Sequence, residues 1–232
     1  MSKRNEKKQD NEQVIEIVEG IHKTEKFLKT NKNTLMYAVG GVVLIVISIF
    51  GYSEFIAKPK NLAAAEQMYL SQNYFEKDSL SLALNGNGPL EPGFKDIIEE
   101  YGSTPAGNLA KFYAGVCCLK LGDYNQAIEY FNAFKADDEI FAARALANIG
   151  NSYVELGELD NAVKYFEKAA KIKNNTMTPQ YLMKAATVLV KQQHYDRAQK
   201  IYEEVKYKHP QSNEARTVDK HIERIKMLIS AN

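Results

Sequence analysis

The sequence GVCCLKLGDYNQAIEYF, at residues 115–131, decides the fold because it recurs along the chain at a nearly constant interval. It returns as GNSYVELGELDNAVKYF at 150–166 and, more weakly, as ATVLVKQQHYDRAQKIY at 186–202. The intervals are 35 and then 36 residues, and such a period is typical of proteins built from stacked helical hairpins. The chain is therefore predicted to be all-α, with a solenoid of helical hairpins as its main domain.

Each copy predicts two helices joined by a tight turn. Gly122 and Gly157 supply the turn, because glycine adopts positive φ without strain at the end of a helix. We expect small residues to let the two helices approach closely and large aromatic residues to fill the space between them. The small residues are Gly115, Gly150 and Ala186 on the first helices and Ala127, Ala162 and Ala198 on the second, and the large ones are Phe131, Phe166 and Tyr202.

This spacing resembles the tetratricopeptide repeat (TPR) signature, which it matches in three repeats over residues 108–212. Ala169 and Pro210 also fall on signature positions, whereas the third repeat has Gln193 where the turn glycine is expected. The resemblance implies that partners bind a concave face lined by the first helices. On this chain the corresponding positions are Leu109, Phe112, Val116, Leu119 and Lys120, then Arg144, Ala147, Asn151, Val154 and Glu155, then Gln180, Met183, Thr187, Val190 and Lys191.

The first of these helices has two interpretations. Leu109, Phe112, Val116 and Leu119 share one face, which is exposed and concave in the TPR pattern. Alternatively, they pack against the residues before them and belong to the core. Some TPR cochaperones bind a C-terminal dicarboxylate through a Lys/Asn set, but Phe112 and Val116 occupy two of its positions here. A mixed apolar groove instead suits an extended segment or a partner helix.

The repeats are flanked by helical segments on both sides. Residues 58–107 are predicted to form a degenerate first helical pair, with a helix over 61–84, a loop at 85–93 and a shorter helix at 94–101. Residues 213–232 are predicted to form a capping helix, which the end of a solenoid requires. Its apolar stripe is Val218, Ile222, Ile225 and Ile229.

An uncharged run before the repeats predicts a membrane anchor. No charged residue occurs from Asn33 to Ser53, and about 20 apolar residues suffice for a helix to cross a bilayer. Residues 34–57 are therefore predicted to be a transmembrane helix in contact with lipid, with Gly40, Gly41 and Gly51 as candidate contacts to a partner helix. The alternatives are a buried core helix, which is rarely so uniformly apolar, and a cleaved signal peptide, which would have a shorter apolar run and a shorter polar segment before it.

Lysines predict the orientation of this helix. Lys23, Lys26, Lys29 and Lys32 precede it, so the positive-inside rule places residues 1–33 in the cytoplasm and the repeats across the membrane. Within this cytoplasmic arm, apolar residues at helical spacing indicate an amphipathic helix over residues 12–30, which would lie on the membrane surface or dock on a partner. The alternative for this arm is a frayed charged tail.

Other classes of function find no support in the residues. The net charge of +1 gives no reason to expect nucleic acid as a partner. The two cysteines, Cys117 and Cys118, are adjacent, and the four histidines are scattered without the spacing of a metal site. No phosphate-binding loop or nucleophile motif occurs. We therefore expect a protein-binding chain with no catalytic activity, no cofactor and no metal.

The layout of the whole chain resembles a narrower family, the YfgM-type ancillary subunits of the Sec translocon. The best local match is STPAGNLA at 103–110, and further matches are Phe27, Asn31, Gly40-Gly41 and Gly51-Tyr52. The resemblance implies a bacterial inner-membrane protein whose repeat domain lies in the periplasm. There it would partner translocon subunits and a membrane-anchored, parvulin-like peptidyl-prolyl isomerase, and would assist secreted protein clients. The alternatives are a structural scaffold for envelope-complex assembly and a general holdase chaperone.

Overall fold

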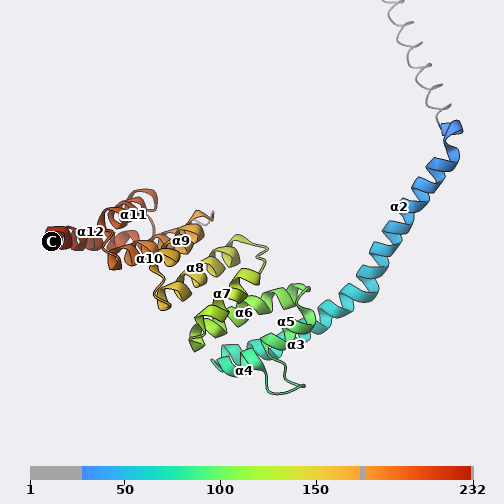
Figure 1. The fold of residues 1–232 in the computed structure, drawn as a ribbon, viewed down its shortest axis with the longest axis horizontal. Helices are drawn as coiled ribbons and strands as arrows, with labels where there is room; N and C mark the ends of the chain where they lie inside the picture. The colour runs from blue at the N-terminus through green and yellow to red at the C-terminus, as the bar shows by residue number, and fades with distance from the viewer. Residues whose placement is uncertain (1–27, 173–175, 231–232) are drawn as a thin grey trace, which may run out of the picture. The chain divides into compact units, whose positions relative to one another are not determined.

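The computed structural model describes residues 28–172 and 176–230, which form helices joined by turns and loops, without a strand among them (Figure 1). The chain divides into two compact units, residues 1–59 and 60–232. The amphipathic helix predicted over residues 12–30 lies almost wholly outside the described residues, and it stays a prediction.

The first unit contains a long apolar helix. Helix α2 (Lys32–Tyr52) passes into a π-helical turn, η1 (Ser53–Ala57), which leads directly into α3 (Lys58–Glu76). The end residues Ser53 and Lys58 both have right-handed helical dihedral angles. The predicted membrane segment 34–57 therefore ends within a continuous helical backbone and not at a helix end.

The apolar side chains of this helix face outward. Val43, Ile45, Ile47 and Phe50 are all exposed, at 49–65% of their surface. Among the described residues, one helix is long and apolar enough to cross a membrane. No residue of its most apolar stretch is buried.

The second unit begins with three helices in place of the expected two. The predicted helix over 61–84 is wrong at 77–79, where α3 ends and α4 (Leu80–Asn85) begins. Asp78 has φ of 56°, a left-handed conformation that cannot continue a right-handed helix. A loop then leads to α5 (Phe94–Tyr101) and is attached to α3 by the buried Ser71, whose hydroxyl donates to the Pro92 carbonyl at 2.7 Å.

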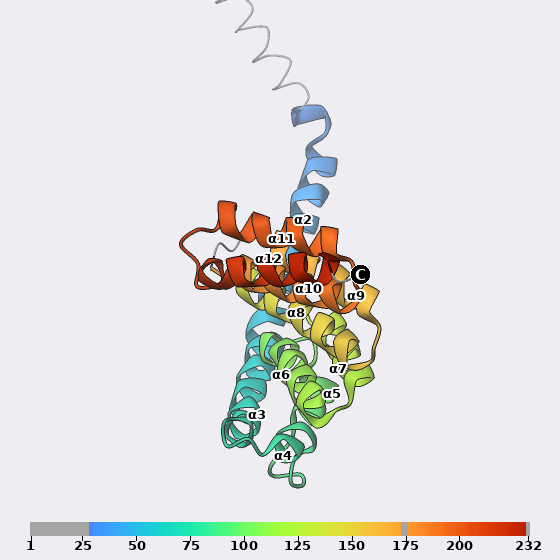
Figure 2. The ribbon, with the colours of Figure 1, turned by 90° about the vertical axis from the view of Figure 1, so that its left-hand side faces the viewer.

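Three helical hairpins follow in chain order, as Figures 1 and 2 show. The first comprises α6 (Pro105–Leu121) and α7 (Tyr124–Ala133), the second α8 (Glu139–Glu155) and α9 (Leu159–Lys171), and the third α10 (Thr178–Lys191) and α11 (Tyr195–Lys208). Two hydrophobic cores hold them together. Helix α8 contributes to both, with Ile149 in the N-terminal core and Ala147 in the C-terminal core.

The predicted pairing of small and large residues is confirmed in the first two hairpins. A Cβ atom added to Gly115 would lie 2.9 Å from the Phe131 ring, and one added to Gly150 would lie 2.8 Å from the Phe166 ring. Real Cβ atoms are not found so close to another atom. The missing Cβ atom at both positions therefore lets the aromatic ring of the second helix pack directly on the first helix, without the shift that an alanine would require there.

The third hairpin turns in the same way without a glycine. Gly122, Gly157 and Gln193 have φ of 87°, 77° and 63°, and in each case the next amide donates to a carbonyl five residues earlier. The last of these bonds joins His194 to Leu189 at 2.9 Å. The departure at Gln193 therefore leaves the turn intact, at a cost of about 1 kcal/mol for a side chain in the left-handed region.

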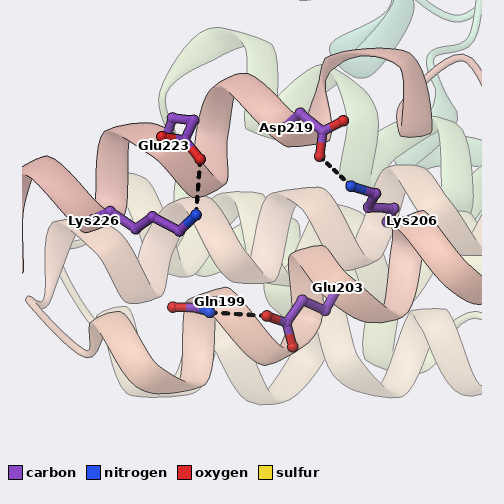
Figure 3. A network of polar contacts seen from close by, with 6 residues as sticks. All are labelled: Gln199, Glu203, Lys206, Asp219, Glu223 and Lys226. Atoms are coloured by element: carbon purple, nitrogen blue, oxygen red, sulfur yellow. Dashed lines mark hydrogen bonds and ion pairs between the residues drawn. The ribbon is translucent and has the colours of Figure 1, made fainter.

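Helix α12 (Ala215–Ser230) closes the C-terminal end by packing against α11. Val218, Ile222 and Ile225 of the predicted apolar stripe are buried, whereas Ile229, the last residue of the stripe, is 45% exposed and lies beside the exposed turn residues Gln193 and His194. Polar contacts line the other surfaces of α11 and α12. In Figure 3, Lys206 of α11 donates to Asp219 of α12 at 2.6 Å, while Gln199–Glu203 and Lys226–Glu223 bond within their own helices.

Candidate functional site

The first helices of the three hairpins line a groove that contains two adjoining cavities. We name them the Arg144 cavity, of about 530 Å³, and the Met183 cavity, of about 730 Å³. Asn151, Gln180 and Lys184 line both of them, so the groove is continuous along α6, α8 and α10. A concave surface of this kind is the feature by which solenoid proteins bind extended partners.

Most of the residues predicted for the concave face line this groove. Leu119, Lys120, Asn151, Val154, Glu155 and Met183 line the Met183 cavity, together with Gln180 and Thr187. Phe112, Val116, Arg144 and Ala147 line the Arg144 cavity. Leu109 and Val190 line neither cavity, and both pack half-buried against the cores.

Phe112 is the residue whose surroundings differ most from expectation. Its side chain is only 7% exposed, and its ring lies 4.9 Å from that of Phe141, 5.4 Å from Phe134 and 5.7 Å from Phe131. Phe141 lies in the first turn of α8 and Phe134 in the loop before it, and both rings contact Phe112 on α6. Phe112 is therefore a core residue that forms part of the cavity floor. Of the two interpretations of this helix face, the exposed one is wrong for Phe112 and the core one is right, although these three rings follow Phe112 in the sequence and do not precede it.

Lys120 lies at the edge of the groove with a partner from the N-terminal helices. Its ammonium group is 3.0 Å from the carboxylate of Asp78 and 5.8 Å from the centre of the Phe75 ring. Asp78 belongs to the unpredicted break between α3 and α4, so this break places an acidic side chain beside the first hairpin. The charge of Lys120 is already paired within the chain.

Lys184 is a groove residue that the repeat pattern missed. Its ammonium group donates to Oδ1 of Asn151 at 2.8 Å and lies 5.5 Å from the centre of the Phe166 ring. Burial lowers the pKa of Lys184. The signal was present in the sequence: Lys184 is the one charged residue of TPQYLMKAATVLV, the apolar run at 178–190.

The two cavities differ in charge. The Arg144 cavity is lined by Arg144 and Lys184 and, among the described residues, by no carboxylate. The Met183 cavity carries Lys120 and Lys184 but also Glu155 and Glu214. Within residues 28–172 and 176–230, neither Arg144 nor Lys184 forms an ion pair. The Arg144 cavity is thus cationic with an aromatic lining from Phe75, Phe112, Tyr113, Phe141 and Tyr181.

The two cysteines lie in the core and line neither cavity. Cys117 and Cys118 are free and fully buried, and burial raises their pKa to about 12 and about 11, so both thiols are protonated at neutral pH. The described residues contain no group of three or more His, Cys, Asp or Glu side chains that could hold a metal ion.

The predicted membrane-helix contacts belong to the first unit. A Cβ atom added to Gly40, Gly41 or Gly51 would have nothing within 4 Å. Contact of these glycines with a partner helix therefore stays a prediction.

Comparison with known proteins identifies the repeats. Three family models, each described as a tetratricopeptide repeat, match residues 94–140, 143–176 and 180–212. No curated protein sequence matches the chain. The crystal structure of the apo form of RapI has a similar fold, with a TM-score of 0.56 and 18% identity over 73% of this chain and 48% of RapI. This chain thus spans about half the length of RapI, and the likeness concerns the fold.

Proposed function

Because tetratricopeptide repeats occupy residues 94–140, 143–176 and 180–212, we propose that this chain is a membrane-anchored scaffold that binds other proteins and catalyses no reaction. The observation that carries the proposal is the continuous groove along α6, α8 and α10. It joins two cavities of roughly peptide-sized volume, and its lining mixes aromatic, aliphatic and charged side chains. Such a lining suits an extended segment of a partner protein.

The anchor in this proposal is the apolar segment at residues 34–57. Its outward-facing apolar side chains would be costly in water but are favourable in lipid. The lysines before it support a cytoplasmic N-terminus, which would place the repeat domain in the periplasm of a bacterial cell.

This topology predicts the activity of fused reporters. Alkaline phosphatase, which is active only outside the cytoplasm, should be active when fused after residue 60 and inactive when fused at residue 10. A fluorescent protein that matures only in the cytoplasm serves as the control and should give the opposite pattern. Phosphatase activity at the N-terminal fusion alone would contradict both the orientation and the periplasmic location.

Within this class we propose an accessory subunit of the Sec translocation machinery. Its partners would be translocon subunits, a membrane-anchored parvulin-like peptidyl-prolyl isomerase and emerging secreted proteins. The support is the resemblance to YfgM-type subunits, with STPAGNLA at 103–110 as its best local match. Part of this motif has a structural role here, since the Thr104 hydroxyl accepts from the Gly107 amide at 3.0 Å and so caps α6.

Co-purification from membranes in mild detergent tests this assignment. The full-length protein should retain translocon subunits and the isomerase as its main partners. A set of envelope-assembly components in their place would indicate a structural scaffold. A broad mixture of clients without a dominant partner would indicate a general holdase, and either result would contradict the Sec assignment.

A further inference from the structure

Positive charge is not balanced among the described lining residues of the Arg144 cavity, whereas the Met183 cavity carries carboxylates as well. The side chains of Lys184 and Arg144 face the Arg144 cavity without a carboxylate among its described lining residues. Removing an ammonium group from water costs free energy unless an anion or a set of hydrogen bonds replaces the lost hydration. Lys184 is half-buried and forms no ion pair among the described residues, so an anion bound in the cavity would replace the hydration that burial removes.

One hydrogen bond and one aromatic contact position the ammonium group of Lys184. An ammonium group has three N–H donors. One of them is taken by Oδ1 of Asn151, at 2.8 Å, and the Phe166 ring gives a weaker contact with the charge. The Asn151 side chain is itself oriented, because its amide donates to Oδ1 of Asn148 at 3.2 Å. Lys184 is therefore held in place by Asn151 while its ammonium group faces both cavities.

On the basis of the proposed protein-binding function, we propose that the groove recognises an aspartate or glutamate side chain within an extended segment of the partner protein. Lys184 and Arg144 bind this carboxylate, and aromatic or aliphatic residues beside it fill the two cavities. A carboxylate supplies the negative charge that is absent from the described lining residues of the Arg144 cavity. Charge-assisted hydrogen bonds to a carboxylate are also about twice as strong as neutral ones.

The position of Lys184 favours an acidic side chain in the interior of the partner's segment over the carboxylate at the partner's C-terminus. Lys184 lines both cavities, together with Asn151 and Gln180. A carboxylate bound there lies where the cavities meet, and a segment that fills both must continue on either side of it. A C-terminal carboxylate at this point would leave one cavity empty. The occupant is therefore a continuous segment with the acid in its interior.

An array of random-sequence synthetic decapeptides, each with an amidated and a free C-terminus, tests the inference with full-length protein in lipid nanodiscs. Bound peptides should be enriched in Asp or Glu next to Leu, Phe or Tyr, and should bind equally well with amidated ends. Binding without enrichment in acids, or only to free C-termini, would overturn the inference while leaving a protein-binding groove. Failure to bind any peptide would count against the proposed function as well.

Point variants test whether Lys184 and Arg144 cause the preference for acidic peptides. The strongest amidated peptide and its copy with the acid replaced by Asn or Gln are compared by fluorescence anisotropy. Wild type should prefer the acidic peptide about tenfold or more. Lys184→Gln and Arg144→Gln should lose most of this preference, whereas the exposed Lys164→Gln and Arg216→Gln should keep it. Circular dichroism melting checks that all four variants are folded. A preference that survives in both groove variants would overturn the assignment.

Discussion

Replacing Phe112 by alanine is expected to lower the free energy of unfolding by about 3–5 kcal/mol. The side chain is 7% exposed and its ring contacts those of Phe131, Phe134 and Phe141, so its removal leaves a gap in the N-terminal core beneath the Arg144 cavity. Urea denaturation of the full-length protein in detergent micelles, followed by circular dichroism, measures the change.

Leu121 provides the control for this substitution. It lies on the same helix, α6, but is 49% exposed, so Leu121→Ala should change the free energy of unfolding by less than about 1 kcal/mol. Similar small effects for both variants would mean that Phe112 is an exposed groove residue, as the repeat pattern alone suggests.

Gly107→Ala is expected to destabilise the protein by about 3 kcal/mol, near the upper end of the usual cost of overpacking. An added Cβ atom would lie 1.9 Å from the carbonyl oxygen of Tyr101 and 2.4 Å from its carbonyl carbon. Both atoms belong to the backbone, so no side chain can rotate away and α5 must shift relative to α6. Thermal unfolding monitored by circular dichroism should show a clearly lower midpoint.

The matched glycine-to-alanine control is Gly41 in α2. A Cβ atom there meets nothing within 4 Å, and alanine is the better helix former. Gly41→Ala should leave the thermal midpoint of the repeat domain unchanged. Equal midpoints for Gly107→Ala and wild type would show that the α5–α6 junction is looser than the structure indicates.

The repeat architecture could be predicted because its determinants are local in the sequence. The pairing of Gly115 with Phe131 depends on a spacing of 16 residues along one hairpin, and the structure confirms it. Whether the turn at Gln193 keeps the geometry of the other two turns could not be predicted from the repeat pattern, which expects glycine there. Its geometry is imposed by hydrogen bonds such as that from His194 to Leu189, which tolerate a non-glycine residue at a modest cost.

The groove was less predictable because its exposure depends on contacts between hairpins. The repeat pattern places Phe112 on the concave face, but it carries no information about Phe141, which comes from the next hairpin and covers it. Conversely, Lys184 lies outside the pattern positions. It lines the groove because its side chain reaches back to Asn151 on α8, a contact between residues 33 positions apart.

The central claim is that the concave face of α6, α8 and α10 binds the partner protein. Site-specific photo-crosslinking in living cells tests it, with p-benzoylphenylalanine placed at Val154 or Thr187 in the groove, or at Lys164 or Lys200 on the second helices. The account predicts that both groove positions crosslink to the same partner, a translocon subunit or a secreted protein in transit, and that the second-helix positions do not. Crosslinks to that partner from Lys164 and Lys200, without any from Val154 and Thr187, would contradict it.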